Sequence, residues 1–490
     1  MSTASSSSTT VSSTDDCDNN RSRLTDDQNN STDFFPSSNI RIFRSLLENS
    51  NAEMKEAMIW ELLVSCDESN LEYASRILDF IRQKHIIHTR SDPISSLPPR
   101  IAIKILRLLD PKSLCNCMLV CRAWRNLCNE SCLWKGLCNS ASFYRICSCE
   151  ADQQHLLKHR NRDGTFSWKK IFSERYRLWK NWLTGRCVIR TLLGHTQGVT
   201  CVQFDDERIV SGSIDKTIRV WDVKCNTMTG VGTMTLTGHS NTVRCLHLSG
   251  NRLASGSNDF SIKIWDLAVN RTWSSIACRQ TMLGHGNFVR CLQMDDHELI
   301  SGSYDCTLKK WSLATGQCLS TLKCEYFLYF SGHNGAVICL QSSNGMLVSG
   351  SADLSIKCWD NRSGICTMTL HNSHSNVITC VRFDNERIIS GSVDQTIKMW
   401  DLRTGRCLQT LDWKLREGHT GVVRNLQVDA WRIVSAADDR TVKVWDIHSG
   451  ERLCTLYNHT DGVTCLQFND YQIVSGSYDK TVKLWDFRVC

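Results

Sequence analysis

The sequence of 490 residues contains no apolar run of 18 residues and no basic start followed by an apolar stretch. A membrane-spanning helix requires the first feature, and a signal peptide requires the second. We therefore expect a chain that neither spans a membrane nor is secreted, located in the cytoplasm, the nucleus or both. Its 27 cysteines are then expected to be free thiols, because disulfides are rare in reducing compartments.

Motifs of several enzyme classes are also missing. The sequence has no Cys-x-x-Cys pair, no P-loop and no dinucleotide-binding glycine motif. One candidate zinc set consists of Cys147, Cys149, His155 and His159, but its Cys-x-Cys spacing is tighter than the usual two to four intervening residues. We predict no enzymatic activity, no catalytic residues, no cofactor and no metal.

One spacing recurs seven times in the second half of the chain. A His is followed after 20 residues by an Asp and after 6 more by a Trp, and a Ser lies four residues before each Asp. Repeats of about 40 to 45 residues with a Gly-His start and a Trp-Asp end indicate the blades of a β-propeller. The units, written as His, Ser, Asp and Trp, are His195/Ser211/Asp215/Trp221, His239/Ser255/Asp259/Trp265, His285/Ser301/Asp305/Trp311, His333/Ser349/Asp353/Trp359, His374/Ser390/Asp394/Trp400, His419/Ser435/Asp439/Trp445 and His459/Ser475/Asp479/Trp485.

These Ser, His and Asp residues are predicted to be structural. A catalytic triad is recognised by one particular geometry, whereas this set occurs in every unit. We expect hydrogen bonds from Trp to Ser to His to Asp that join the strands and turns of each blade.

Each unit is predicted to contain three short strands and a more variable outer strand. The last unit ends only five residues after Trp485, so we expect residues 185–192 to supply its outer strand and close the ring. The predicted fold is multidomain: a closed, all-β, seven-bladed propeller over residues 185–490, preceded by α-helical segments.

The N-terminal part has a different composition. Residues 1–50 are predicted to form a disordered tail, because the beginning is rich in Ser and Thr, with 11 of them among the first 14 residues. Residues 51–90 show helical spacing, with Met54, Met58 and Leu62 on one stripe. Two interpretations stay open for this segment: it docks on the neighbouring helical domain, or it self-associates.

Residues 96–138 are predicted to form short helices with more apolar surface than they can enclose. Asp110 is suited to cap a helix that begins at Pro111. An apolar stripe precedes this cap and consists of Ile101, Ile105, Leu108 and Leu109. We therefore expect this segment to bind a partner protein.

This segment resembles an F-box in its Leu-Pro, Leu-Asp-Pro, Val-Cys-x-x-Trp and Leu-Trp elements. Together with the repeats, the chain resembles the F-box/WD-repeat proteins, the substrate receptors of Skp–cullin–F-box (SCF) ubiquitin ligases. The resemblance implies that the F-box binds the Skp adaptor of a cullin–RING core and that the propeller binds a substrate, often a phosphorylated one, for ubiquitination and proteasomal degradation. Residues 51–90 further resemble a dimerisation segment of this family, which implies a homodimer. The adaptor-binding residues implied are Leu97, Pro98, Ile105, Leu109, Pro111, Leu114, Val120, Trp124, Leu133 and Trp134.

Residues 139–184 are expected to be a helical linker. Within it, one predicted helix has an apolar face that contains Trp168 and Trp182 and is expected to pack on the propeller. The opposite face is assigned Lys169, Lys170, Arg175, Arg177 and Lys180. Such a basic face is more often solvated than bound to nucleic acid, so we expect no nucleic-acid partner.

The ligand of the propeller is predicted to bind at the rim of the central channel. Five residues after each His, the innermost strand begins, and Arg244, Arg290 and Arg424 occupy this position in three units. Asn258, Tyr304 and Tyr478 lie in turns on the same face. Arg forms bidentate hydrogen bonds with phosphate, so these six residues are the candidate site for a phosphorylated substrate. The alternative is that the rim arginines form ion pairs with neighbouring loops.

Two other functions remain open at this point. A WD-repeat scaffold of the G-protein-β type would use the propeller without an adaptor. An RNA- or chromatin-binding propeller would use the basic linker, and its binding would fall steeply with salt.

Overall fold

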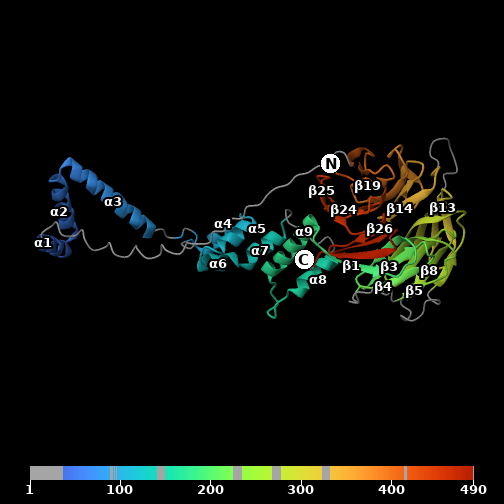
Figure 1. Cartoon of the computed structure of the whole chain (residues 1–490), viewed down its shortest axis with the longest axis horizontal. Coiled ribbons are helices and arrows are strands. Elements are labelled where there is room, and N and C mark those ends of the chain that lie inside the picture. Colours follow the sequence, from blue (N-terminus) through green and yellow to red (C-terminus); the bar gives the residue numbers. More distant parts are fainter. Residues whose placement is uncertain are drawn as a thin grey trace, which may run out of the picture. The chain divides into compact units, whose positions relative to one another are not determined.

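The computed structural model describes residues 37–88, 92, 94, 97–140, 149–223, 234–267, 278–322, 332–412 and 417–488, and its elements are numbered as in Figure 1. The chain forms two compact units, Met1–Pro98 and Pro99–Cys490. Among the described residues, no helix combines the length and the apolar character needed to cross a bilayer.

The first unit consists of three helices, α1 (Ser37–Glu48), α2 (Ala52–Val64) and α3 (Glu68–His88). Helix α1 lies inside the range predicted to be disordered, so that prediction is wrong for residues 37–48. Its apolar residues Ile40, Phe43 and Leu47 have helical spacing, which the abundance of Ser and Thr at the start of the chain obscured. Residues 1–36 lie outside the described residues.

Helices α2 and α3 leave much of their apolar surface exposed. No residue of α2 is buried, and Trp60 is 69% exposed. The first unit therefore presents apolar surface that its own helices do not cover.

The second unit begins with four short helices, which we call the F-box helices: α4 (Pro99–Leu106), α5 (Pro111–Cys117), α6 (Arg122–Cys128) and α7 (Ser131–Cys138). Asp110 caps α5 as predicted, because its carboxylate accepts hydrogen bonds from the backbone N–H groups of Lys112 and Ser113 at 3.0 and 3.2 Å. The helices pack around a small core that contains Leu106, Leu114, Leu133 and Trp134.

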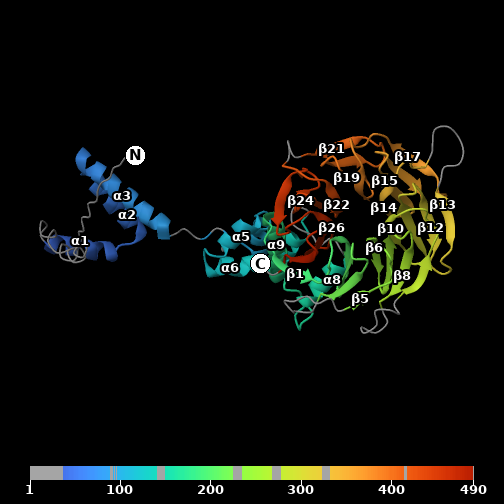
Figure 2. The ribbon, with the colours of Figure 1, turned by 45° about the vertical axis from the view of Figure 1, so that its right-hand side comes forward.

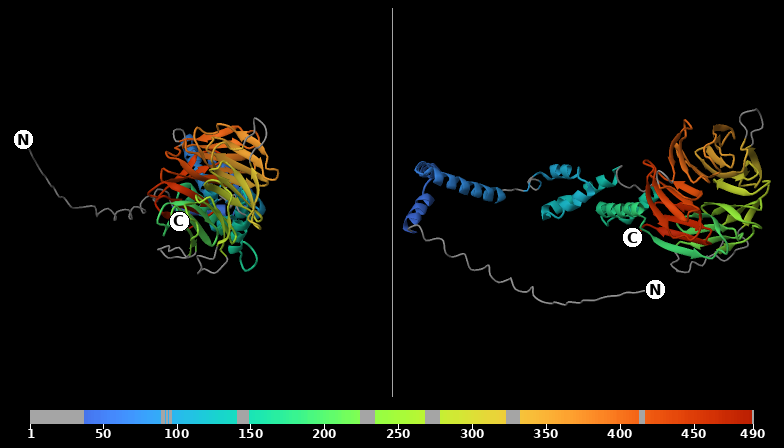
Figure 3. Two further views of the ribbon diagram at one scale, coloured as in Figure 1. Left: turned by 90° about the vertical axis from the view of Figure 1, so that its right-hand side faces the viewer. Right: turned by 45° about the horizontal axis from the view of Figure 1, so that its top comes forward.

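Helices α8 (Cys149–Lys158) and α9 (Trp168–Thr184) follow the F-box helices. Helix α9 packs on α7 and on the propeller, and Figure 3 shows it beside the C-terminal blade in red. The indole of Trp182 stacks on Phe487 with 3.9 Å between ring centroids, and its N–H donates to the carbonyl of Asp470 at 3.0 Å. The predicted packing of this helix on the propeller is confirmed.

The prediction is wrong for one basic residue of α9, which does not lie on the solvated face. Arg175 is 6% exposed and forms an ion pair with Asp152 of α8, whereas it was predicted on the solvated face. The pattern of α9 alone could not show that a second helix would supply a carboxylate on this side.

The rest of the second unit is a propeller of seven antiparallel four-stranded sheets arranged in a ring (Figure 2). The innermost strands are β2 (Val199–Phe204), β6 (Val243–Ser249), β10 (Val289–Met294), β14 (Val337–Ser343), β18 (Ile378–Phe383), β22 (Val423–Val428) and β26 (Val463–Phe468). The second strands are β3 (Arg208–Ser213), β7 (Arg252–Ser257), β11 (Glu298–Ser303), β15 (Met346–Ser351), β19 (Arg387–Ser392), β23 (Arg432–Ala437) and β27 (Gln472–Ser477).

The third strands carry the Trp of each repeat and are β4 (Ile218–Asp222), β8 (Ile262–Asp266), β12 (Leu308–Ser312), β16 (Ile356–Asp360), β20 (Ile397–Asp401), β24 (Thr441–Asp446) and β28 (Thr481–Asp486). The outer strands are β5 (Met234–Leu236), β9 (Cys278–Met282), β13 (Cys318–Leu322), β17 (Cys366–Leu370), β21 (Cys407–Leu411), β25 (Arg452–Tyr457) and β1 (Val188–Leu193).

The ring is closed by the strand predicted from the sequence. Strand β1 pairs antiparallel with β28, with Val188 opposite Asp486 and Leu193 opposite Thr481. The first strand of the propeller therefore completes the last blade, which leaves no free edge at this point of the ring.

The predicted polar chain is present in all seven blades. In the third blade, Trp311 Nε1 donates to Ser301 Oγ at 2.8 Å, His285 Nε2 lies 2.7 Å from the same hydroxyl, and His285 Nδ1 lies 2.8 Å from Asp305. The other six blades repeat these contacts with N···O and O···N distances of 2.7 to 2.9 Å. These four residues join the turn and two strands within each blade.

Six blades also share a buried Cys opposite a Gly, one pair for each inner strand and its neighbour. In the third blade Cys291 pairs with Gly302, and a Cβ added to this glycine would lie 2.7 Å from the thiol sulfur. The sixth blade has Asn425 in place of Cys, and its partner is Ala436 instead of Gly. The cysteine is therefore a compact core residue, as predicted, and its sulfur occupies the space that only glycine leaves free.

Candidate functional site

The mouth of the central channel is lined by the residues that follow each His by five positions. Each of them lies at a bulge in its inner strand, where the strand register shifts, and bulges turn side chains out of the regular pleat. The channel has a volume of about 400 Å³. The seven residues are Thr200, Arg244, Arg290, Ile338, Thr379, Arg424 and Thr464.

Arg244 and Arg290 lie on adjacent blades, and each is half-buried. The Nε–H group of Arg244 donates to Asn258 Oδ1 at 3.1 Å, which fixes one edge of this guanidinium. Among the described residues, Arg290 forms no hydrogen bond and no ion pair. Burial and the neighbouring positive charge of Arg290 both lower the pKa of Arg244. Two neighbouring guanidinium groups without a carboxylate partner in the described part of the chain are chemically suited to an anion, and we call them the candidate anion site.

Arg424 differs from the other two rim arginines. Its Nε and Nη2 atoms donate to the two carboxylate oxygens of Asp438 at 2.8 and 2.7 Å. This bidentate ion pair raises the pKa of Arg424 and neutralises its charge. The alternative of an ion pair with a neighbouring turn therefore holds for Arg424, and we set it apart from the candidate anion site.

Two tyrosines complete the predicted set. The phenols of Tyr304 and Tyr478 lie close enough to Arg244 and Arg424 to influence both guanidinium groups. Tyr304 is 41% exposed, so part of this residue is accessible to a ligand.

The sequence reasoning missed an aromatic cluster beside Arg290. Phe288 lies 5.7 Å from Phe260 and 5.7 Å from Tyr304 between ring centroids, and all three rings are exposed. Phe260 has φ +68°, a left-handed conformation that is unfavourable for a bulky residue. The sequence held a signal for this cluster, because Phe260 is the one aromatic residue at this turn position. The other six blades have Lys216, Cys306, Leu354, Gln395, Arg440 and Lys480 there. The cluster adds an apolar surface to the candidate anion site.

A second ring of residues lies lower in the channel, eight positions after each His. Five blades have Gln here, and all five amides accept a backbone hydrogen bond across the boundary between blades, as Gln203 does from Leu248 N–H at 3.1 Å and Gln293 does from Ser342 N–H at 2.6 Å. The other two blades have His247 and Arg382. Burial, followed by the charge of Arg382, lowers the pKa of His247 to about 4. The positive charge of the channel therefore extends below its mouth.

The repeated Ser, His and Asp residues do not form an active site. The seven Ser residues are 0% exposed and the His side chains are at most 1% exposed, whereas the nucleophile and base of a hydrolase must be accessible to the substrate. Burial acts to raise the pKa of each Asp, but hydrogen bonds from His and from a neighbouring Thr or Ser outweigh it and lower the pKa. These residues hold the blades together.

The F-box helices present the second candidate surface. In the turns that follow α4 and α5, Leu108 is 86% exposed, Leu119 is 77% exposed and Val120 is 64% exposed. Ile101 and Ile105 of α4 are exposed as well, while Ala102 and Leu106, which lie about 100° further round the helix, are buried. Monomeric proteins rarely expose apolar side chains in such a group, so this face is suited to a protein partner.

The predicted adaptor-binding residues divide into two groups. Pro98, Ile105 and Val120 are exposed, and Leu97, Leu109, Pro111 and Trp124 are half-buried. Leu114, Leu133 and Trp134 are buried, and the indole N–H of Trp134 donates to the carbonyl of Cys128 at 2.7 Å. We assign these three residues to the core that holds the F-box helices in place.

The candidate zinc set is described only in part. Cys147 lies outside the described residues, as does the side chain of Cys149. His155 and His159 are both described, and their rings are close to Glu174 of α9.

Comparisons with known proteins match both halves of the chain. The F-box-like family matches residues 94–140, and the WD domain, G-beta repeat family matches residues 186–222 and 230–266. The family described as Nucleolar protein 10-like, N-terminal domain, matches residues 280–477.

Similar curated proteins come from fungi. "Probable E3 ubiquitin ligase complex SCF subunit sconB" of Arthroderma otae is 29% identical over 204 residues, which cover 37% of this chain and 29% of the relative. An F-box protein of Saccharomyces cerevisiae is 31% identical over 202 residues, which cover 38% of this chain and 30% of the relative. The chain thus spans about a third of the length of these relatives. With an F-box-like domain, WD repeats and a seven-bladed propeller, the chain is an F-box/WD-repeat protein.

Proposed function

We propose that the chain is the substrate-recognition subunit of an SCF-type ubiquitin ligase. One observation carries this proposal: a single chain combines exposed apolar side chains on and between its F-box helices with a channel mouth that holds two guanidinium groups without a carboxylate partner among the described residues. The names of the relatives, an SCF subunit and an F-box protein, support the same role. The chain itself is proposed to be a non-catalytic receptor that acts in the cytoplasm, the nucleus or both.

The F-box helices are proposed to bind a Skp-type adaptor, which links the chain to the cullin–RING core. Leu108, Leu119 and Val120 supply apolar area that is removed from water only when a partner covers it. Buried Leu114, Leu133 and Trp134 hold this face in position.

The rim is proposed to bind a phosphorylated segment of the substrate. A phosphoserine or phosphothreonine carries a charge of about −1.5 to −2 and three acceptor oxygens. Arg290 has its guanidinium donors free of other described groups, and Arg244 is oriented by Asn258. The exposed rings of Phe260, Phe288 and Tyr304 would contact apolar residues next to the phosphate.

The first unit is proposed to mediate self-association. Exposed Trp60 of α2 and exposed Leu78 of α3 belong to its uncovered apolar surface. Sedimentation of the full chain should show a dimer that Trp60→Asp weakens. A wild-type monomer would contradict self-association and leave the receptor role unchanged.

The phosphate proposal is tested with a library of peptides, each present in a phosphorylated and an unphosphorylated form. The full chain should bind a subset of the phosphorylated forms. Arg244→Ala and Arg290→Ala should each weaken the binding of the best phosphopeptide by about 10- to 150-fold, because each removes a charge-assisted hydrogen bond. Lys at either position should restore binding only in part, because an ammonium group lacks the planar fork of Arg.

The matched control is Arg403→Ala. Arg403 is an exposed arginine in the turn between β20 and β21, at the opposite end of the strands from the channel mouth, so binding should not change. Equal affinity of the wild type for both forms of every peptide would contradict phosphate recognition. The adaptor proposal would still stand in that case, because it depends on other residues.

A further inference from the structure

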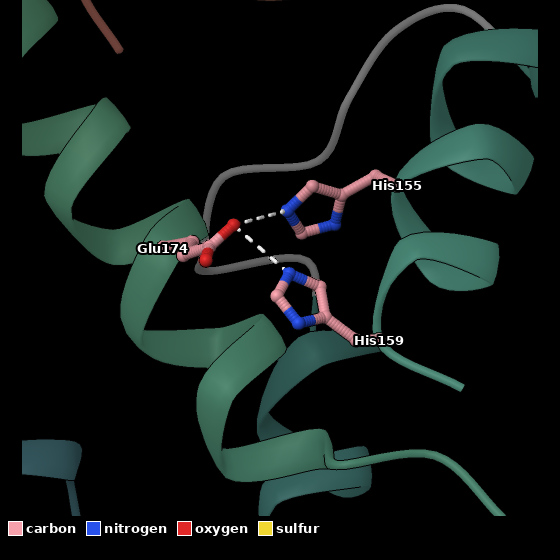
Figure 4. A group of neighbouring side chains, drawn as sticks. All are labelled: His155, His159 and Glu174. Carbon is pink, nitrogen blue, oxygen red and sulfur yellow. Dashed lines mark hydrogen bonds and ion pairs between the residues drawn. The ribbon is translucent and has the colours of Figure 1, made fainter. Parts of the chain in front are cut away.

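Two histidines and one glutamate converge where α8 and α9 meet, as Figure 4 shows. His155 lies in the last turn of α8, and His159 follows directly after this helix. Their spacing of four residues places both rings on the same side of the turn. Glu174 reaches them from α9, so the three side chains come from two separate segments.

The spacing of the donor atoms suits one metal ion. His155 Nε2 lies 3.2 Å and His159 Nε2 lies 2.9 Å from Glu174 Oε2, and all three donor atoms lie within 4.8 Å of one another. Zinc bonds of about 2.0–2.1 Å in a tetrahedron place neighbouring ligand atoms about 3.3 Å apart. Small outward shifts of these side chains would therefore accommodate the ion.

The ligand side chains are largely withdrawn from solvent. The side chains of His155 and His159 are 10% and 11% exposed, and that of Glu174 is 33% exposed. Two imidazoles and one carboxylate are also a ligand set that binds zinc in proteins.

The surroundings leave room for a further ligand. A cavity of about 330 Å³ adjoins the cluster and is lined by His155, Glu174, Lys158 and Arg175, among others. His155 Nδ1 is buried without a hydrogen-bond partner among the described residues, so water in the cavity could serve this atom and the ion. In zinc sites with three protein ligands, water commonly occupies the fourth position.

Two cations oppose the ion, and neither blocks the site. Lys158 Nζ lies 3.8 Å from Glu174 Oε2, but its side chain is 68% exposed and can turn into solvent. Arg175 is already paired with Asp152. The local charge thus weakens metal binding without occupying the donor atoms.

We propose that His155, His159 and Glu174 bind a zinc-class divalent cation that joins α8 to α9. Two imidazole ligands favour zinc over magnesium or calcium, which bind through oxygen. Because α9 packs on both α7 and the propeller, the ion would stiffen the segment between the F-box helices and the propeller. This site replaces the cysteine-containing set considered from the sequence, and it departs from our expectation of no metal.

The experiment uses the purified full chain, stripped with a chelator and titrated with Zn²⁺ against a competing indicator. The wild type should bind one zinc ion. H159N and E174Q should each weaken zinc binding, and by more than the 10- to 100-fold loss that is typical when a group that only orients a metal ligand is changed. Lys158→Met should tighten binding, because it removes the nearby positive charge from an exposed position. His448→Asn is the matched control, since His448 is exposed in the turn between β24 and β25 and should have no effect.

Cobalt substitution separates this site from zinc bound by cysteine. The absorption spectrum of the Co²⁺ form should show nitrogen and oxygen ligands, and it should be lost in H159N. A spectrum dominated by thiolate ligands, or equal zinc affinity in the wild type and H159N, would overturn the proposal. An unchanged affinity in Lys158→Met, whose exposed side chain is not needed for folding, would also count against it.

Discussion

The F-box helices and the propeller use apolar side chains in opposite ways. In the propeller, Leu299 and Leu347 are completely buried, and the Trp of every repeat is enclosed between blades. In the turns that connect the F-box helices, Leu108 and Leu119 are among the most exposed apolar residues of the described chain. The propeller therefore buries a large apolar core between its blades, whereas the F-box region leaves a large share of its few apolar residues for a partner to cover.

Size explains this difference. A segment of about 45 residues cannot enclose a large core, while a ring of about 300 residues can bury most of what its unfolded chain exposes. The same residue type therefore has a role in binding in one region and in stability in the other.

The largest expected effect is the loss of adaptor binding in Leu108→Asp. A carboxylate on the exposed apolar face should weaken binding of a purified Skp-type adaptor by about 30-fold or more, as for a residue at the centre of an interface. The unfolding free energy should change by less than about 0.5 kcal/mol, because the side chain is exposed. Calorimetric titration and urea unfolding measure the two quantities.

The control for this substitution is Leu319→Asp, an exposed leucine on the outer strand β13. It should alter neither quantity. If both variants bound the adaptor as well as the wild type, the exposed F-box face would not be the adaptor site.

The next largest effect is a difference in unfolding free energy between the same Leu→Ala substitution made in the propeller and in the F-box region. Leu299→Ala should lower the unfolding free energy of the propeller by about 2 to 5 kcal/mol, because it leaves a cavity in a closed core. Leu108→Ala should lower it by no more than about 0.5 kcal/mol. Urea unfolding of both variants checks this contrast, and equal losses would show that the F-box face is packed in the free chain.

A smaller effect is expected where a cysteine fills the space beside a glycine. Gly302→Ala should cost about 1 to 3 kcal/mol, because the new Cβ would lie 2.7 Å from both Cys291 Sγ and Val337 Cγ1. Adding Cys291→Ala should recover part of this loss, with a coupling of at least about 0.5 kcal/mol in a double-mutant cycle. Strict additivity would mean that the sulfur does not occupy this space.

The smallest expected effect on stability is that of a change of pH. The pKa of each repeated Asp is lowered on folding, and that of Asp439 falls to about 2, so their contribution is present above about pH 4 and is lost as the pH falls further. Burial lowers the pKa of His419 and His459, despite their Asp partners, so stability should begin to fall already below about pH 6.5.

Hydrogen exchange at pH 7 and pH 4.5 distinguishes the two regions. After correction for the slower intrinsic exchange at pH 4.5, protection should fall more in the propeller strands than in the F-box helices, which lack the repeated His and Asp residues. A propeller that becomes more protected at the lower pH would contradict this assignment.

The sequence predicted what depends on a repeated register. The blades, the polar chain and the closing strand β1 all follow from the constant spacing of His, Asp and Trp, because each side chain keeps its place in the blade. The cap at Asp110 followed from local chemistry alone.

Contacts between segments were harder to predict. The ion pair of Arg424 with Asp438 depends on two strands of one blade, and the burial of Arg175 depends on the approach of α8. Glu174 was missed as a partner of His155 and His159 for the same reason. The sequence did hold a hint of the ion pair between Arg424 and Asp438. The residue before the repeated Asp faces the rim position, and only the sixth blade has an acidic residue there.

Whether the exposed F-box face and the rim act together is decided by ubiquitin transfer in a reconstituted SCF ligase. The substrate is the best phosphopeptide from the library, extended with lysines. The wild-type chain should support transfer to the phosphorylated peptide, and Leu108→Asp and the Arg244→Ala/Arg290→Ala double variant should each abolish it while remaining folded. Transfer that persists in both variants, or that is equal for the unphosphorylated peptide, would contradict the proposed receptor function.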